Sequence, residues 1–163
     1  MLTGLAPITS PGTVVLVLGS FPGARSLAER RYYAHPQNQF WKILQAIWPA
    51  NALPAGADSY QKRSKWLLDR GLGLWDVYAA CEREGSLDSA IRGGVVNDIA
   101  GLRLPKLAAI AHNGGESFRH ARHTAEIGVP VYRLPSTSPA NASWSFDRKL
   151  AAWRDVFARH GLV

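Results

Sequence analysis

The octapeptide TVVLVLGS, at residues 13–20, is built from aliphatic and β-branched side chains and ends in glycine and serine. A continuous apolar run of this kind is typical of a strand that is buried on both faces, as in a parallel sheet. Three weaker segments of the same type follow at residues 71–78, 107–112 and 129–134. The sequence therefore predicts four central strands.

Helical patterns lie between and after these strands. They cover residues 39–48, 59–70, 116–127 and 146–159. Asp58 and Ser145 are suited to cap helix starts, and Gly71 and Gly128 are suited to end helices. Strands that alternate with helices imply crossover connections and a mainly parallel sheet. We predict one α/β domain over residues 1–163, a three-layer sandwich whose central, mainly parallel four-stranded sheet is flanked by helices.

The composition excludes several classes of protein. Hydrophobic residues make up 47% of the 163-residue chain, as in a globular rather than a disordered protein. The single cysteine, Cys81, rules out an intrachain disulfide and a four-cysteine iron–sulfur or zinc site. No apolar run is long enough to cross a bilayer, and no secretory signal is recognisable. We expect a cytoplasmic monomer that needs neither a metal nor a cofactor and does not bind membranes.

The charge of the chain points to a polyanionic partner. Nineteen Lys and Arg residues against twelve Asp and Glu residues give a formal net charge of +7. Nucleic acid is the commonest partner of so basic a chain, although a generally basic surface explains the same excess. The basic residues are scattered from Arg25 to Arg159, so the charge does not identify a binding face.

In open parallel sheets, ligands bind beyond the carboxyl ends of the strands. The first such end carries GSFPG, residues 19–23, whose glycines and proline form a tight turn that lets the backbone approach a ligand. The others are residues 76–78, 113–115 and 135–141. A purely structural turn explains GSFPG equally well.

Two further segments concentrate polar and aromatic groups. In YYAHPQNQFW, residues 32–41, Tyr33 can stack on a base and the Asn38 amide can form hydrogen bonds in a base pocket. Alternatively, Asn38 simply caps the next helix. LPSTSPANAS, residues 134–143, is rich in small hydroxyl residues that can donate to a phosphate backbone. A polar connector is the alternative for this second loop.

These three segments, in this order, resemble the motifs of the uracil-DNA glycosylase superfamily. Together with LWDV at 74–77 and CEREGSLD at 81–88, they are similar to its hypoxanthine-DNA glycosylase (DNA-deoxyinosine glycosylase) branch. The resemblance extends from about Thr13 to the C-terminus. It implies a monofunctional enzyme of base excision repair, which flips a damaged base out of double-stranded or single-stranded DNA and hydrolyses its N-glycosidic bond.

The resemblance also assigns roles to residues. Phe21 stands where many relatives carry the Asp or Asn that positions water, so the catalytic role passes to Asn38. Ser136 replaces a histidine that stabilises the leaving base in uracil enzymes. The residues expected to bind the base are Gly19, Ser20, Phe21, Gly23, Tyr33, Asp76 and Asn113. Those expected to bind the DNA backbone are Ser136, Thr137, Ser138, Pro139, Ala140 and Asn141.

Alternatives stay open at this point. Asp76 can accept a hydrogen bond from N1–H of hypoxanthine, act as the general base in place of Asn38, or merely cap a turn. His35 and His112 can donate to the base or be structural. Ser86 with Asp88 reads as a helix cap. Hypoxanthine is the expected base because Gly23 leaves the pocket open; a uracil or mismatch-specific glycosylase, or a non-catalytic damaged-DNA-binding protein, are the other candidates.

Overall fold

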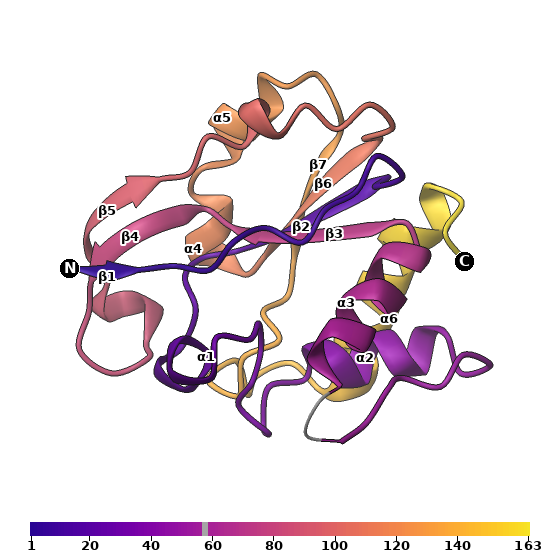
Figure 1. The fold of residues 1–163 in the computed structure, drawn as a ribbon, viewed down its shortest axis with the longest axis horizontal. Coiled ribbons are helices and arrows are strands. Elements are labelled where there is room, and N and C mark those ends of the chain that lie inside the picture. Colours follow the sequence, from indigo (N-terminus) through magenta and orange to yellow (C-terminus); the bar gives the residue numbers. More distant parts are fainter. Residues whose placement is uncertain (57–58) are drawn as a thin grey trace.

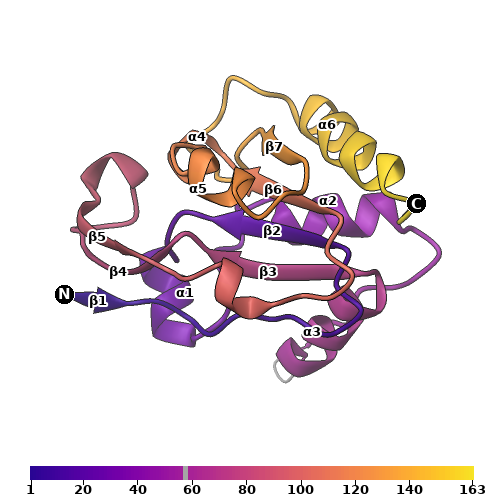
Figure 2. The same cartoon turned by 90° about the horizontal axis from the view of Figure 1, so that it is seen from above.

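A four-stranded parallel sheet forms the centre of the computed structural model, which describes residues 1–56 and 59–163. Its order is β3-β2-β6-β7, and all three pairings are parallel (Figures 1 and 2). The strands are β2 (Val15–Gly19), β3 (Leu72–Asp76), β6 (Ala109–Asn113) and β7 (Val131–Leu134). The α/β class and the four central strands expected from the sequence are confirmed.

Strand β2 lies between β3 and β6 and is buried along its whole length. Val15 and Val17 face one hydrophobic cluster, whereas Leu16 and Leu18 face another. Because neither face of the strand meets water, polar alternation is absent from its sequence.

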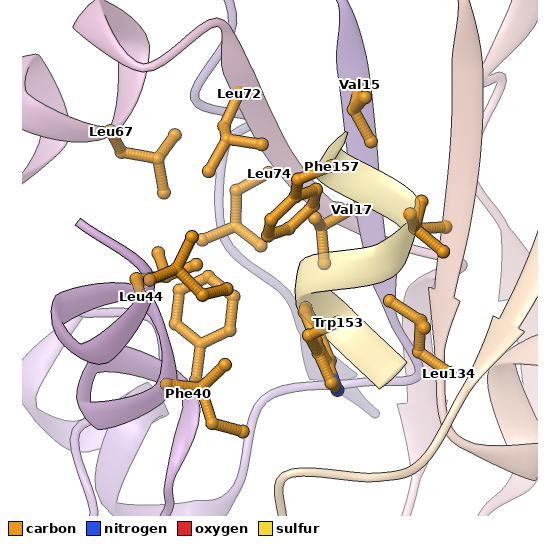
Figure 3. Close-up of a cluster of buried hydrophobic side chains, with 14 of the residues drawn as sticks. Val15, Val17, Phe40, Leu44, Leu67, Leu72, Leu74, Leu134, Trp153 and Phe157 are labelled. Carbon is orange, nitrogen blue, oxygen red and sulfur yellow. The ribbon is translucent and has the colours of Figure 1, made fainter. Parts of the chain in front are cut away.

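Three helices cover one face of the sheet: α2 (Phe40–Ile47), α3 (Tyr60–Asp69) and α6 (Phe146–Arg159). Figure 3 shows Phe40 of α2 and Trp153 of α6 in this cluster, where their rings meet edge to face at 5.9 Å. Ser145 caps α6 as expected, since its hydroxyl accepts a hydrogen bond from the Arg148 amide. The expected cap Asp58 lies outside the described residues.

The single helix expected over residues 116–127 is wrong. Two short helices, α4 (Gly115–Phe118) and α5 (Ala121–Ala125), take its place. His112 explains the break, because its Nδ1 lies 2.8 Å from Ser117 Oγ and its Nε2 lies 2.9 Å from Thr124 Oγ1. In a continuous helix those two residues would be about 10 Å apart along the axis, too far for one imidazole to reach both.

A second, antiparallel sheet was not expected. It has the order β1-β4-β5 and consists of β1 (Leu2–Thr3), β4 (Tyr78–Glu82) and β5 (Arg92–Val96). Strand β4 begins two residues after β3 ends, so the chain passes directly from one sheet to the other at Asp76. The short helix α1 (Ala24–Glu29) and two 3₁₀ turns, Asp88–Ala90 and Ala100–Leu102, complete the fold. No helix among the described residues is long and apolar enough to cross a membrane.

Candidate active site

The loops that follow β2, β3, β6 and β7 open onto one cavity of about 930 Å³. In Figure 1, α1, the segment that leads into α2 and the loop after β7 lie together below the sheet. Every site residue expected from the sequence lines this cavity, including Asn38 and residues 136–141. Among the described residues, no group of three or more His, Cys, Asp or Glu side chains is arranged to hold a metal ion.

Asp76 brings a buried carboxyl group to the cavity wall at the end of β3. Its side chain is 4% exposed in total, and its Oδ2 has no hydrogen-bond partner among the described residues. Burial, reinforced by the carboxylate of Asp88 and opposed by Arg83, raises the pKa of Asp76 to about 7. A buried polar atom without a partner is rare in folded proteins, so this oxygen still has the capacity to accept a hydrogen bond.

The side chains around residue 19 leave room only for glycine at the end of β2. It pairs with Asp76 in the register of β2 and β3. A Cβ atom at residue 19 would collide with the Asp76 carboxyl and would lie 3.0 Å from the Tyr33 hydroxyl. Glycine at the end of the strand thus lets these two side chains converge on the cavity.

The ring of Tyr33 is fixed in place from behind. It stacks on Phe40 with a centroid distance of 4.2 Å and an interplanar angle of 26°. Its backbone is left-handed, with φ of 54°, a conformation that a non-glycine residue keeps only where its surroundings hold it. Its hydroxyl accepts a hydrogen bond of 3.0 Å from Asn113 Nδ2, and burial raises the pKa of that hydroxyl. The ring is therefore a rigid part of the cavity wall.

Asn113 joins separate parts of the site. Its Nδ2 donates to the hydroxyls of Tyr33 and Thr137, each at 3.0 Å, and its Oδ1 accepts from the Thr137 amide at 3.1 Å. Thr137 is 1% exposed, and its carbonyl accepts from the Gln39 amide at the start of α2. Both amide hydrogens of Asn113 are thus engaged within the protein, which leaves only Oδ1 to accept from a base.

Asn38 both starts a helix and faces the cavity. The N-cap position of α2 is Gln39, one residue after Asn38, but Asn38 Oδ1 still caps the helix, because it accepts a hydrogen bond of 2.9 Å from the Phe40 amide in the first turn. The cap fixes the orientation of the side-chain amide. The second lone pair of Oδ1 is left, and no hydrogen bond among the described residues uses Nδ2. Capping and contact with a ligand are therefore compatible.

Two histidines considered as donors have different surroundings. His35 is exposed and lines the cavity; its Nδ1 accepts from the Gln37 amide at 3.1 Å, so the neutral ring carries its proton on Nε2. His112 is fully buried, and desolvation lowers its pKa to about 4. Because both nitrogens of His112 are engaged inside the protein, it is a structural residue.

A loop from the second sheet braces GSFPG. The Ser20 hydroxyl donates to Asp88 Oδ1 at 2.6 Å, and the Ser86 hydroxyl accepts from the Ala24 amide at 2.9 Å. The helix cap expected of Ser86 with Asp88 is therefore wrong for their own 3₁₀ turn, whose N-cap is Leu87 without a side-chain bond; Ser86 instead binds the first amide of α1, from a distant part of the chain. Asp88 is a cavity residue that sequence reasoning missed, because no local pattern distinguishes it from a turn residue.

Phe21 is 6% exposed and belongs to a core cluster under its loop. The guanidinium of Arg83 lies 5.3 Å from the centre of its ring and donates to the Pro22 carbonyl at 2.8 Å. Arg83 thus fixes the loop at Phe21, the position where the resemblance implied an acid or amide. Phe21 has no polar atom and the Arg83 guanidinium has no acceptor, so neither side chain can accept a hydrogen bond from the attacking water.

Residues 136–141, part of the LPSTSPANAS segment and here called the second-motif loop, are held in shape by hydrogen bonds within the loop. The Ser138 amide donates to Ser136 Oγ at 3.1 Å, and the Asn141 amide donates to the Ser138 carbonyl at 3.0 Å. Pro139 and Ala140 are exposed at its tip. Trp153 of α6 donates to the Pro135 carbonyl at 3.0 Å. The loop therefore presents a small, rigid surface beside the cavity.

Known proteins resemble this chain along almost its whole length. A family model described as the uracil DNA glycosylase superfamily matches residues 6–157. A hypoxanthine DNA glycosylase of Methanosarcina acetivorans is 35% identical over 159 residues, which cover 96% of this chain and 98% of the relative. One of Methanosarcina barkeri is 33% identical over 162 residues, with the same coverage.

A solution NMR structure gives the same result for the fold. It is of a Methanosarcina acetivorans protein provisionally named a uracil DNA glycosylase, and it superposes with a TM-score of 0.84. The two sequences are 34% identical, and the match covers 96% of each chain. The chain therefore belongs to the uracil DNA glycosylase superfamily.

Proposed function

We propose that this monofunctional DNA glycosylase removes hypoxanthine from deoxyinosine in DNA as a step of base excision repair. The observation that carries the proposal is the unpartnered Oδ2 of Asp76 on the cavity wall. An ionised carboxylate accepts a hydrogen bond from N1–H of hypoxanthine, whereas adenine presents a lone pair at N1 and would be repelled. The two relatives named hypoxanthine DNA glycosylase support the same base.

The size of the pocket favours a purine. Gly23 has φ of −63°, which any residue adopts, so the backbone does not require glycine there. A Cβ at residue 23 would meet only Ser86, at 3.6 Å, an ordinary contact. The glycine is therefore not imposed by the local fold, and its effect is to leave space for a base larger than a pyrimidine.

The bond is hydrolysed through a cation-like sugar. The amide of Asn38 is scarcely basic, so its contribution is to hold the attacking water in line rather than to remove a proton. The DNA phosphates stabilise the cation electrostatically. Negative charge that develops on the base requires donors near its N7 or O6. The Nε2–H of His35 and main-chain N–H groups of the GSFPG loop are among the donors on the cavity wall.

The test is single-turnover excision from inosine and uracil duplexes with matched flanks and partners, read out by alkaline strand scission. We expect hypoxanthine to be released faster. Uracil release that is faster by tenfold, about 1.4 kcal/mol of barrier, would assign the protein to a uracil or mismatch-specific activity. Tight binding to the inosine duplex without any release would instead indicate a damaged-DNA-binding protein.

The Gly23→Tyr variant tests in the same assay whether residue 23 sets the size of the pocket. Its side chain would occupy the space beside the GSFPG loop, so we expect it to slow hypoxanthine release more than uracil release. An equal loss for both bases would mean that Gly23 does not set the size of the pocket.

A further inference from the structure

Lys149 of α6 is a buried cation that the proposed reaction does not use. Its side chain is 2% exposed, and its Nζ donates one long hydrogen bond of 3.5 Å to the Ser138 carbonyl. Among the described residues no carboxylate forms an ion pair with it. Desolvation alone lowers the pKa of Lys149, and no neighbouring acid opposes this effect. A buried ammonium without a counter-ion destabilises the free protein.

The ammonium lies directly under the second-motif loop. Ser138, which it contacts, belongs to that loop, and the tip at Pro139 and Ala140 is exposed. One helical turn further on, Trp153 bonds the Pro135 carbonyl, so the same face of α6 supports the beginning and the middle of the loop.

Anchoring the loop does not explain a charge at this position. The Ser138 carbonyl already accepts a hydrogen bond from the Asn141 amide, and Trp153 already holds the start of the loop. A neutral side chain of similar length would fill the same space without the desolvation penalty. The charge needs a partner, and the described residues supply none.

We infer that Lys149 is part of a phosphate site, and that its counter-ion is a DNA phosphate bound on the outer surface of the second-motif loop. The inference rests on the proposed function, which makes DNA the ligand. The loop lies between the ammonium and the phosphate, so water and salt are excluded from the space between the two charges. Their attraction is therefore screened much less than that of the surface arginines.

The test compares Lys149→Met, which removes the charge, with Lys149→Gln, which removes the charge but keeps a donor for Ser138. Binding to a duplex with a stable abasic-site analogue is measured over a range of salt concentrations, and the free proteins are melted. We expect both variants to bind about tenfold more weakly at low salt. The slope of log affinity against log salt should fall by roughly 0.9, the value for one phosphate. The free Lys149→Met protein should be as stable as the wild type or more so.

Lys65→Met is the control, because Lys65 is an exposed residue of α3 outside the cavity wall and should leave the slope unchanged. Wild-type binding and salt slope in Lys149→Gln would overturn the inference and leave Lys149 as a loop anchor only. If neither variant folds, the ¹⁵Nζ resonance of Lys149 in the wild-type protein decides: it should shift on addition of the duplex, and no shift overturns the inference. A wild-type protein that fails to bind the duplex would refute the proposed function instead.

Discussion

At the scale of single residues, Asn38 uses one side-chain oxygen to cap α2 while its amide faces the cavity. We expect Asn38→Ala to reduce single-turnover excision by on the order of 10² or more, because water is no longer held in line. Loss of the cap should lower the free energy of unfolding by about 0.5–2 kcal/mol. Binding to inosine-containing DNA should persist, which a gel-shift assay can measure.

Asn38→Ser separates the two roles of this residue. Serine is also a good N-cap, so thermal stability should return toward that of the wild type. Excision should stay low, because a hydroxyl is shorter than an amide and offers no Nδ2. Near-native excision in the alanine variant would instead transfer the catalytic role to Asp76.

The raised pKa of Asp76 predicts that the rate of excision depends on pH. A carboxylate that accepts from N1–H or from water must be ionised, and its pKa is raised to about 7. The value of kcat/KM should therefore fall as pH drops below about 7. In Asp76→Asn this acidic limb should disappear. A wild-type rate that is unchanged between pH 6 and pH 8 would contradict a role for the ionised form.

The same carboxyl group has a defined effect on stability. The folded state keeps its proton to a higher pH than the unfolded chain, whose aspartates titrate near 3.9. Stability should therefore decline as pH rises from about 4 toward 7, and Asp76→Asn should remove this contribution. Thermal melts of both proteins across that range measure the difference.

At the scale of elements, the paired ends of β2 and β3 bring the side chains of Asp76 and Tyr33 together only because residue 19 is glycine. Gly19→Ala should push away the Asp76 carboxyl and the Tyr33 ring, with a loss of about 1–3 kcal/mol of stability from overpacking. Excision should fall further than DNA binding. Gly12→Ala is the matched control, because a Cβ there meets only Ser10, at 3.6 Å; equal effects of the two changes would show that the Gly19 contact is unimportant.

The elements that sequence patterns predicted are those with strong burial signals. All four central strands and helices α2, α3 and α6 lie within one or two residues of their expected bounds. Strand β5 was missed because its side chains are exposed throughout and it contains two glycines, so it lacks any alternation. The break between α4 and α5 depends on His112, which reaches both helices only in the folded chain.

The candidate site was predictable to a similar extent. Loops at the carboxyl ends of parallel strands can be located from the sequence, and all of the residues expected there do line the cavity. The network of Asn113, Thr137 and Tyr33 could not be foreseen, since it depends on distances between loops far apart in the chain. For the same reason the position of Asp88 on the cavity wall could not be foreseen, and Lys149 showed no signal of its own.

At the scale of the whole molecule, the net charge of +7 predicts DNA binding that weakens as a power of salt concentration. Each neutralised phosphate should add roughly 0.9 to the slope. Arg133 is exposed on the cavity wall, so Arg133→Ala should reduce the slope by about that amount. Arg159→Ala removes a cation that is paired with Asp155 and lies outside the cavity wall, and it should have little effect. Affinity that is independent of salt would refute electrostatic capture of DNA.

The strand order 3-2-6-7 has a consequence for the chain as it leaves the ribosome. Strand β2 is synthesised before all of its neighbours in the sheet, and β6 and β7 follow only after β4 and β5 of the second sheet. Until then the apolar segment around Leu16 and Leu18 has no partner on one side. The nascent protein must therefore keep this apolar segment out of contact with other chains until most of the protein has been translated. No partly synthesised form can complete the cavity, because residues 133–141 and the later residues Trp144 and Ala152 line it.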